Sequence, residues 1–145
     1  MIALVLALVA AAPAPAQKYA PGTGPNPIII RNNAGGNVME MVRYRQNLAR
    51  SGRPVQFRGY CDSACTILTT LPNSCLGPGA MIGFHAPRIP HTKIIPPLVD
   101  EIMGNFYRNG IRQKWFSTWR HQLKIQRIDA KTYARLDPEV RLCRR

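Results

Sequence analysis

The sequence predicts a single α/β domain with a mostly parallel sheet and a helical C-terminal section. Its 145 residues suit one domain with one hydrophobic core, and no internal repeat or second domain is evident. Short β-branched or apolar runs typical of buried strands alternate with helical patterns along the first two thirds of the chain. Strands and helices that alternate in this way form βαβ units, which place the strands parallel to one another.

The individual elements follow from local patterns. Strands are expected at residues 27–30, 55–58 and 80–84, where apolar residues are bounded by Gly, Pro or Asn. An amphipathic helix is expected over 38–51, because apolar residues recur there at helical spacing and Gly52 and Pro54 follow. A short apolar helix is expected over 63–71 and a Pro-rich loop over 88–97. Further helices are expected over 98–107, 112–124 and 129–136. The aromatic residues of the expected helix over 112–124 favour packing rather than ligand binding.

The first 27 residues differ from the rest of the chain. Residues 1–12 are almost wholly apolar and are followed by Ala14-Pro15-Ala16, the small-residue pattern that signal peptidase cuts. An apolar run this short cannot span a bilayer, which takes roughly 20 residues. We therefore expect a signal peptide over 1–16, a flexible Pro- and Gly-rich lead-in over 17–27 and the domain over 28–145. A buried N-terminal helix is the alternative.

The chain is strongly basic, with a formal net charge of +13. Such a charge favours anionic partners in general. However, the Lys and Arg residues are scattered, without a basic block or an aromatic-basic platform. The pattern therefore favours a solvated basic surface that makes peripheral contact with anionic envelope surfaces, and no specific nucleic-acid partner is expected.

Four cysteines, Cys61, Cys65, Cys75 and Cys143, favour two disulfides in an exported chain. Four cysteines allow three connectivities. A helix of about nine residues, roughly 13 Å long, separates Cys75 from the first two, so a direct Cys61–Cys75 bridge would be strained. Cys143 could tie down the C-terminal tail. A zinc site is the alternative, but the spacing matches no standard zinc motif, and no metal is expected.

Three groups of chemically capable residues follow predicted strands. Gly35 and Gly36 lie between the first strand and its helix, where N–H groups at a helix N-terminus can bind an anion. Ser63 begins the second helix, either as an N-cap or as a nucleophile. His85 follows the third predicted strand. Because ligand and catalytic groups gather at the carboxyl ends of parallel strands, we expect these residues to lie at one sheet edge.

The ordered motifs N-x-x-G-G-x-V, S-A and P-x-x-M-I-x-x-H-x-P resemble the proteolytic subunit of Clp protease, in the crotonase-type superfamily. Closer still are the small exported bacterial Clp-like proteins with C-x-S-A-C-T and G-F-H. The resemblance covers about residues 28–88. It implies a Clp-like fold with Ser63 as nucleophile, His85 as general base, and Gly36 (or Gly35) and Ala64 as N–H donors of an oxyanion hole.

The sequence departs from this pattern in three respects. The first ββα elements of the family have no counterpart before residue 28, so the fold is expected to be truncated at its N-terminus. The third member of the triad is not evident, with Asp129 and Asp137 as the nearest candidates. Asp62 precedes the nucleophile directly, where a carboxylate would oppose a developing oxyanion.

The favoured interpretation is a bacterial periplasmic or secreted serine hydrolase that cleaves peptides or proteins without a cofactor. The resemblance also implies assembly into homo-oligomers. The alternative is a weakly active or inactive Clp-like scaffold that binds peptides or a partner protein. A basic envelope protein that binds anionic polymer is a third hypothesis.

Overall fold

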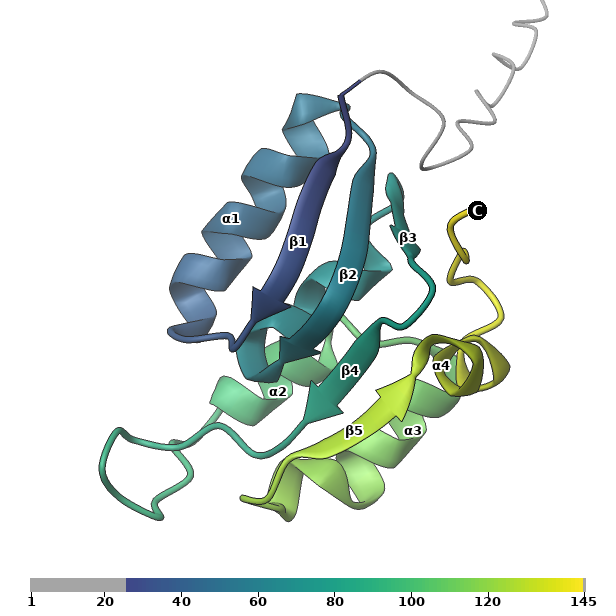
Figure 1. Ribbon diagram of the computed structural model, residues 1–145. Coiled ribbons are helices and arrows are strands. Elements are labelled where there is room, and N and C mark those ends of the chain that lie inside the picture. Colours follow the sequence, from purple (N-terminus) through teal and green to yellow (C-terminus); the bar gives the residue numbers. More distant parts are fainter. Residues whose placement is uncertain (1–25, 145) are drawn as a thin grey trace, which may run out of the picture.

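A five-stranded sheet lies at the centre of the computed structural model, which describes residues 26–144 (Figure 1). The predicted signal peptide and residues 17–25 of the lead-in lie outside these residues. The strand order is β1-β2-β4-β5, and β3 also pairs with β2. The strands are β1 (Ile28–Asn33), β2 (Val55–Asp62), β3 (Ser74–Leu76), β4 (Met81–Phe84) and β5 (Gln126–Asp129).

Strand β2 is the centre of this sheet. Its first half pairs with β3 and its second half with β4, both in parallel, while β1 lies parallel on its other side. Among the strands of the described residues, only β5 is antiparallel, to β4. The ends of β1, β2 and β4 therefore meet at one edge, toward which their three arrowheads point in Figure 1. The predicted mostly parallel sheet is confirmed.

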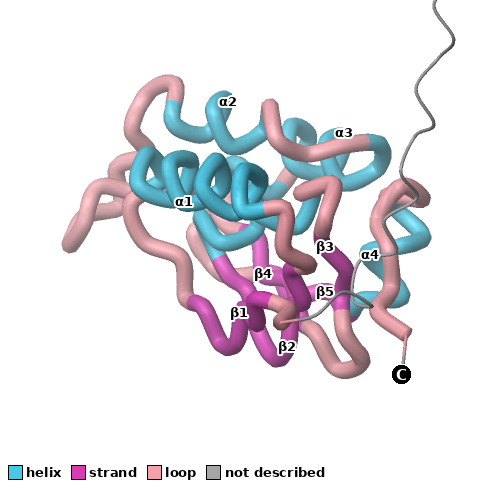
Figure 2. The backbone as a smooth tube through the Cα atoms, turned by 90° about the horizontal axis from the view of Figure 1, so that it is seen from above, coloured by secondary structure: helices cyan, strands magenta, loops and turns pink. Residues whose placement is uncertain are grey.

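Helices α1, α2 and α3 lie on one side of the sheet, and α4 lies near β5 (Figure 2). Their bounds, with those of the 3₁₀ helices η1 and η2, are α1 (Val38–Ser51), η1 (Ser63–Thr70), α2 (Val99–Gly104), α3 (Asn109–Ser117), η2 (Trp119–His121) and α4 (Ala130–Leu136). Helix α1 has the predicted bounds. Asn37 caps its N-terminus by accepting from the Glu40 N–H, and Gly52 ends it with a φ of +63°. Among the described residues, no helix is long and apolar enough to cross a membrane.

Two strands were not predicted. Strand β3 has only three residues, and β5 occupies residues that follow the expected helix 112–124. That helix divides into α3 and η2, and the chain then returns along β4 as β5. Both strands depend on pairing with residues far away in the sequence, which local periodicity does not reveal.

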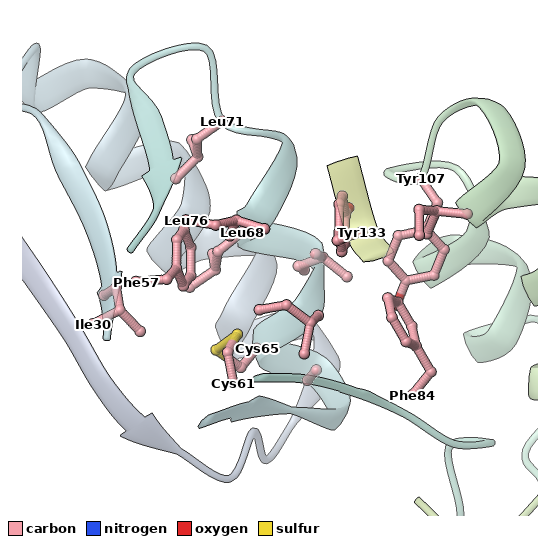
Figure 3. Close-up of a cluster of buried hydrophobic side chains, with 14 of the residues drawn as sticks. Ile30, Phe57, Cys61, Cys65, Leu68, Leu71, Leu76, Phe84, Tyr107 and Tyr133 are labelled. Atoms are coloured by element: carbon pink, nitrogen blue, oxygen red, sulfur yellow. A yellow bond between two sulfur atoms is a disulfide. The ribbon is translucent and has the colours of Figure 1, made fainter. Parts of the chain in front are cut away.

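The core lies between the sheet and the helices (Figure 3). Phe57 on β2 is fully buried, and Phe84 on β4 stacks on Trp119 with ring centroids 4.3 Å apart. Trp115 is also fully buried, which confirms that the aromatic residues of the C-terminal section pack in the core. This packing fixes the C-terminal ends of β2 and β4, which Ser63 and His85 follow directly.

Candidate active site

Ser63 occupies the sharp turn between β2 and η1. Its φ of +57° lies in the left-handed region, which costs a non-glycine residue about 1–2 kcal/mol. A strained strand-to-helix turn also holds the nucleophile of α/β-hydrolases. The N-cap position of η1 belongs to Asp62, and within residues 26–144 the Ser63 hydroxyl makes no hydrogen bond. The described part of the chain therefore gives Ser63 no capping role and leaves its hydroxyl available.

The glycine loop after β1 packs directly against this turn. A Cβ added to Gly35 would lie 2.7 Å from both the Ser63 Cβ and the Asp62 carbonyl oxygen, and 2.8 Å from the Ala64 nitrogen. Gly35 also has a φ of +86°, which L side chains rarely adopt. Close backbone approach thus requires glycine at this position.

The candidate N–H donors of an oxyanion hole differ in availability. The Gly35 N–H donates to the Asn33 side-chain oxygen at 2.8 Å, so this N–H is occupied. Gly36 has a φ of +135°, and a Cβ there would meet open space. The Ala64 N–H lies in the first turn of η1, where N–H groups lack partners within the helix. Gly36 and Ala64 therefore remain as the candidate donors, whereas Gly35 contributes its small size.

His85 follows β4 on the strand adjacent to β2. Asp62 and Gly83 are register partners in this parallel pair, so Ser63 and His85 lie one and two residues beyond it at the same edge. The His85 Nδ1 is 2.7 Å from the Ala86 carbonyl oxygen. Because a carbonyl only accepts, a neutral imidazole in this position has its proton on Nδ1 and its lone pair on Nε2. This is the tautomer that a general base requires. Within the described residues the two side chains share no hydrogen bond.

Neither proposed carboxylate partner hydrogen-bonds to His85. Asp129 is paired with Met81 at the opposite end of β4, and it caps α4 by accepting from the Thr132 N–H at 2.6 Å. This backbone hydrogen bond lowers the pKa of Asp129. Asp137 is fully buried and accepts two hydrogen bonds from Arg108, at 2.8 and 3.1 Å. Both candidates therefore have structural roles away from the sheet edge.

Asp62 has a partner that the sequence did not reveal. Its buried carboxylate accepts from the Arg127 Nε at 3.1 Å and from a second guanidinium nitrogen at 2.6 Å. Asp62, Gly83 and Arg127 are register partners on β2, β4 and β5, and Gly83 lacks the side chain that would separate the other two. This hydrogen bond raises the pKa of Arg127, and the ion pair compensates the charge of Asp62 beside Ser63.

All four cysteines are paired, which confirms the two predicted disulfides and leaves no thiolate for zinc. Cys61 at the end of β2 bonds to Cys65 in η1, so this bridge spans Ser63. Cys75 on β3 bonds to Cys143, which ties down the C-terminal tail as anticipated.

Buried hydrogen bonds hold η1 against the rest of the domain. The Thr66 hydroxyl pairs with the Tyr107 hydroxyl at 2.6 Å, and that of Thr69 with the Tyr133 hydroxyl at 2.8 Å. Burial raises the pKa of both tyrosines, which therefore stay protonated. Arg45 on α1 donates to the Ile67 and Thr70 carbonyl oxygens, at 2.7 and 3.2 Å. The helix that begins at Ser63 is thus held from several sides.

Two cavities lie away from this edge. One of about 410 Å³ lies between residues 76–79, the start of α4 and the C-terminal tail, and one of about 190 Å³ adjoins Pro72 and Arg108. Neither Ser63 nor His85 lines them. A ligand at the Ser63–His85 edge would therefore not occupy either cavity.

No protein-family model and no curated protein matches the sequence. Among solved structures, the chain is similar to a lysine-to-alanine mutant of the membrane-bound stomatin-specific protease 1510-N in complex with a substrate peptide. The TM-score is 0.60 at 18% sequence identity, and the match covers 82% of this chain and 61% of that chain. The chain therefore spans less than two thirds of the protease. It folds as a single mixed α/β domain similar to the Clp-protease fold.

Proposed function

We propose that this chain is a serine-type peptidase in which Ser63 is the nucleophile and His85 the general base. The observation that carries the proposal is the placement of both residues at the same sheet edge, directly after the neighbouring strands β2 and β4. Ser63 lies there on a strained turn, and the His85 Nδ1 contact with the Ala86 carbonyl oxygen leaves Nε2 for the proton of Ser63. In this mechanism, Nε2 takes the Ser63 proton as Oγ attacks the scissile carbonyl. The Gly36 and Ala64 N–H groups stabilise the oxyanion. His85 returns the proton to the leaving amine, and water then hydrolyses the acyl-enzyme.

The Ala86 carbonyl takes the structural role of the triad acid in this proposal. It fixes the Nδ1–H tautomer but carries no full negative charge to stabilise the imidazolium. In a serine protease, replacing the triad Asp, which holds the tautomer and stabilises the imidazolium, by Asn lowers the rate by about 10⁴. We therefore expect a slow enzyme whose acyl transfer is measured more readily by single turnover than by steady-state assays.

A peptide or protein substrate is the favoured class. The structurally similar protease is named for a protein target and holds a substrate peptide. The two disulfides support an oxidising compartment, so we also propose that the mature chain works in the bacterial periplasm or outside the cell.

A fluorophosphonate probe tests the nucleophile. The oxidised full-length chain is expected to react with one equivalent of probe, and Ser63→Ala abolishes labelling. Ser117→Ala is the matched control because Ser117 is exposed on α3 and lies outside the proposed site. His85→Ala is expected to slow labelling at least 100-fold. Absent labelling of the wild type, or equal labelling of wild type and Ser63→Ala, overturns the proposal.

A peptide-binding scaffold is the second candidate. Within residues 26–144, no carboxylate hydrogen-bonds to His85, and Ser63 and His85 do not hydrogen-bond to each other. An inactive scaffold would bind peptides with the same affinity in wild type and Ser63→Ala, and neither protein would react with the probe. Titration of both proteins with a fluorescent peptide library, beside the labelling experiment, separates the two candidates.

A further inference from the structure

The segment between β4 and α2 leaves the domain at the same edge as His85. Ala86 and Pro87 are buried, and the chain then projects away from the sheet before it returns at α2 (Figures 1 and 2). A compact turn closes it, in which the Ile89 N–H donates to the Ile94 carbonyl oxygen at 2.9 Å. The Thr92 hydroxyl and N–H both donate to the Ile89 carbonyl oxygen, at 2.8 and 3.1 Å. These bonds close a turn over residues 89–94, within a segment that we call the projecting loop, residues 88–98.

The projecting loop exposes aliphatic side chains to an unusual degree. Ile94 and Leu98 are 58% and 66% exposed, the two highest values among the large hydrophobic residues that the structure describes. Ile89 is 43% exposed. Leu98 also has a φ of +69°, a conformation that is strained for a branched residue. The two most exposed large hydrophobic side chains of the described residues therefore both lie on this loop.

The charge of the projecting loop has a single sign. Arg88, His91 and Lys93 are exposed, and no acidic residue occurs between His85 and Val99. The first acidic residue beyond the loop, Asp100, is paired with Arg120 at 3.0 Å. Glu101 follows it on α2 and is the nearest acidic side chain in sequence without a salt bridge within the described residues. Exposed aliphatic side chains flanked by basic residues are complementary to an anionic lipid surface, which has charged headgroups above apolar acyl chains.

We propose that residues 88–98 dock on an anionic lipid surface. Ile89, Ile94 and Leu98 enter the boundary between headgroups and acyl chains, and Arg88 and Lys93 contact the lipid phosphates. The area available decides between a lipid surface and a protein partner. Three half-exposed aliphatic side chains offer roughly 300 Å², below the roughly 500 Å² that each partner contributes to a minimal protein interface of about 1,000 Å² in total. Peripheral membrane binding requires only a few inserted side chains together with electrostatic attraction.

This docking would also orient the proposed active site. The projecting loop begins three residues after His85, at the sheet edge that carries Ser63. If the proposed peptidase function holds, its substrates would be polypeptide segments close to the membrane surface. The lipid docking itself does not depend on that function.

A local fluorescent reporter tests the docking in the full-length chain, with the wild type as the reference for the emission of the native Trp115 and Trp119. Ile94→Trp places an indole at the tip, and Met39→Trp places one at a 51%-exposed position on α1 as the matched control. Vesicles of phosphatidylglycerol and phosphatidylcholine in equal parts are expected to shift the emission of Ile94→Trp to the blue. Brominated lipid is expected to quench it. Met39→Trp should show neither change, and pure phosphatidylcholine should have little effect.

A charge variant measures the electrostatic part with the same reporter. Arg88→Gln with Lys93→Gln is expected to weaken vesicle binding of Ile94→Trp about 30-fold, or about fivefold per basic residue. Arg43→Gln with Lys114→Gln removes the same charge from α1 and α3 and should have a much smaller effect. No spectral change at Ile94→Trp, or an equal change at Met39→Trp, overturns the proposal. The proposal is also overturned if the emission of Ile94→Trp shifts without vesicles, increasingly so at higher protein concentration, and the ultracentrifuge shows dimers. That result would assign the loop to self-association.

Discussion

Removing the Cys61–Cys65 disulfide should affect the reactivity of Ser63 more than its small contribution to stability suggests. This bridge joins the end of β2 to η1 across the strained Ser63 turn. The second bridge, Cys75–Cys143, joins β3 to the C-terminal tail and provides a matched control. The two double variants, Cys61→Ala with Cys65→Ala and Cys75→Ala with Cys143→Ala, each remove two largely buried sulfur atoms.

Loss of the Cys75–Cys143 bridge should lower the stability of the fold more, whereas loss of the Cys61–Cys65 bridge should lower the reactivity of Ser63 more. Their sequence separations are 4 and 68 residues, so loop-closure entropy predicts losses of about 2 and about 4 kcal/mol in the free energy of unfolding. Without the Cys61–Cys65 bridge, Ser63 can relax from its left-handed conformation, which is disfavoured by about 1–2 kcal/mol. The reactive conformation would then be populated about 5- to 30-fold less.

Urea denaturation and the rate constant of fluorophosphonate labelling measure the two quantities. Labelling is compared at urea concentrations where every variant is fully folded. We expect the Cys75/Cys143 variant to lose more stability yet label at the wild-type rate, and the Cys61/Cys65 variant to label 5- to 30-fold more slowly. Labelling that is unchanged in the Cys61/Cys65 variant, or that falls equally in both variants, refutes the assigned role of the bridge at Ser63.

Two further predictions concern the turn and the helix that it begins. Gly35→Ala should abolish labelling of Ser63, because the new Cβ would displace the Ser63 turn. Gly52→Ala, at a similarly left-handed position with open space around it, should label normally in the same assay. Because burial raises the pKa of Tyr107 and Tyr133, the unfolded chain loses these protons first, and stability should fall as pH rises above the ordinary value of about 10. Urea midpoints from pH 8 to 11 should fall less steeply in the Tyr107→Phe/Tyr133→Phe variant, and an unchanged slope would contradict this linkage.

Elements with strong local signals were predictable from the sequence. Helix α1 has both an apolar period and clear end signals, Asn37 and Gly52, and its predicted bounds agree with the structure. Strand β2 was predicted only to Arg58, because Gly59 and Tyr60 interrupt the apolar run. Pairing with β4 extends it to Asp62. Local chemistry thus determined both ends of α1, whereas long-range pairing determined how far β2 runs.

The candidate site was likewise predictable only in part. The positions of Ser63 and His85 at one edge followed from strand order, since both residues come directly after parallel strands. The expected carboxylate partner of His85 did not appear among the described residues, because Asp129 and Asp137 are engaged elsewhere. The contact of Nδ1 with the Ala86 carbonyl has no sequence signature, because any residue provides a carbonyl group.

The pairing of Asp62 shows how a residue can oppose catalysis in the sequence and support the site in the structure. A lone carboxylate beside Ser63 would disfavour an oxyanion, and a buried one would be costly. Arg127 removes both problems through two hydrogen bonds, which are possible because Gly83 leaves the space between the strands open. The guanidinium also lies over the Tyr60 ring, 5.3 Å from its centroid. The β5 strand, absent from the predicted elements, therefore provides the charge that makes the predicted Ser63 turn electrostatically acceptable.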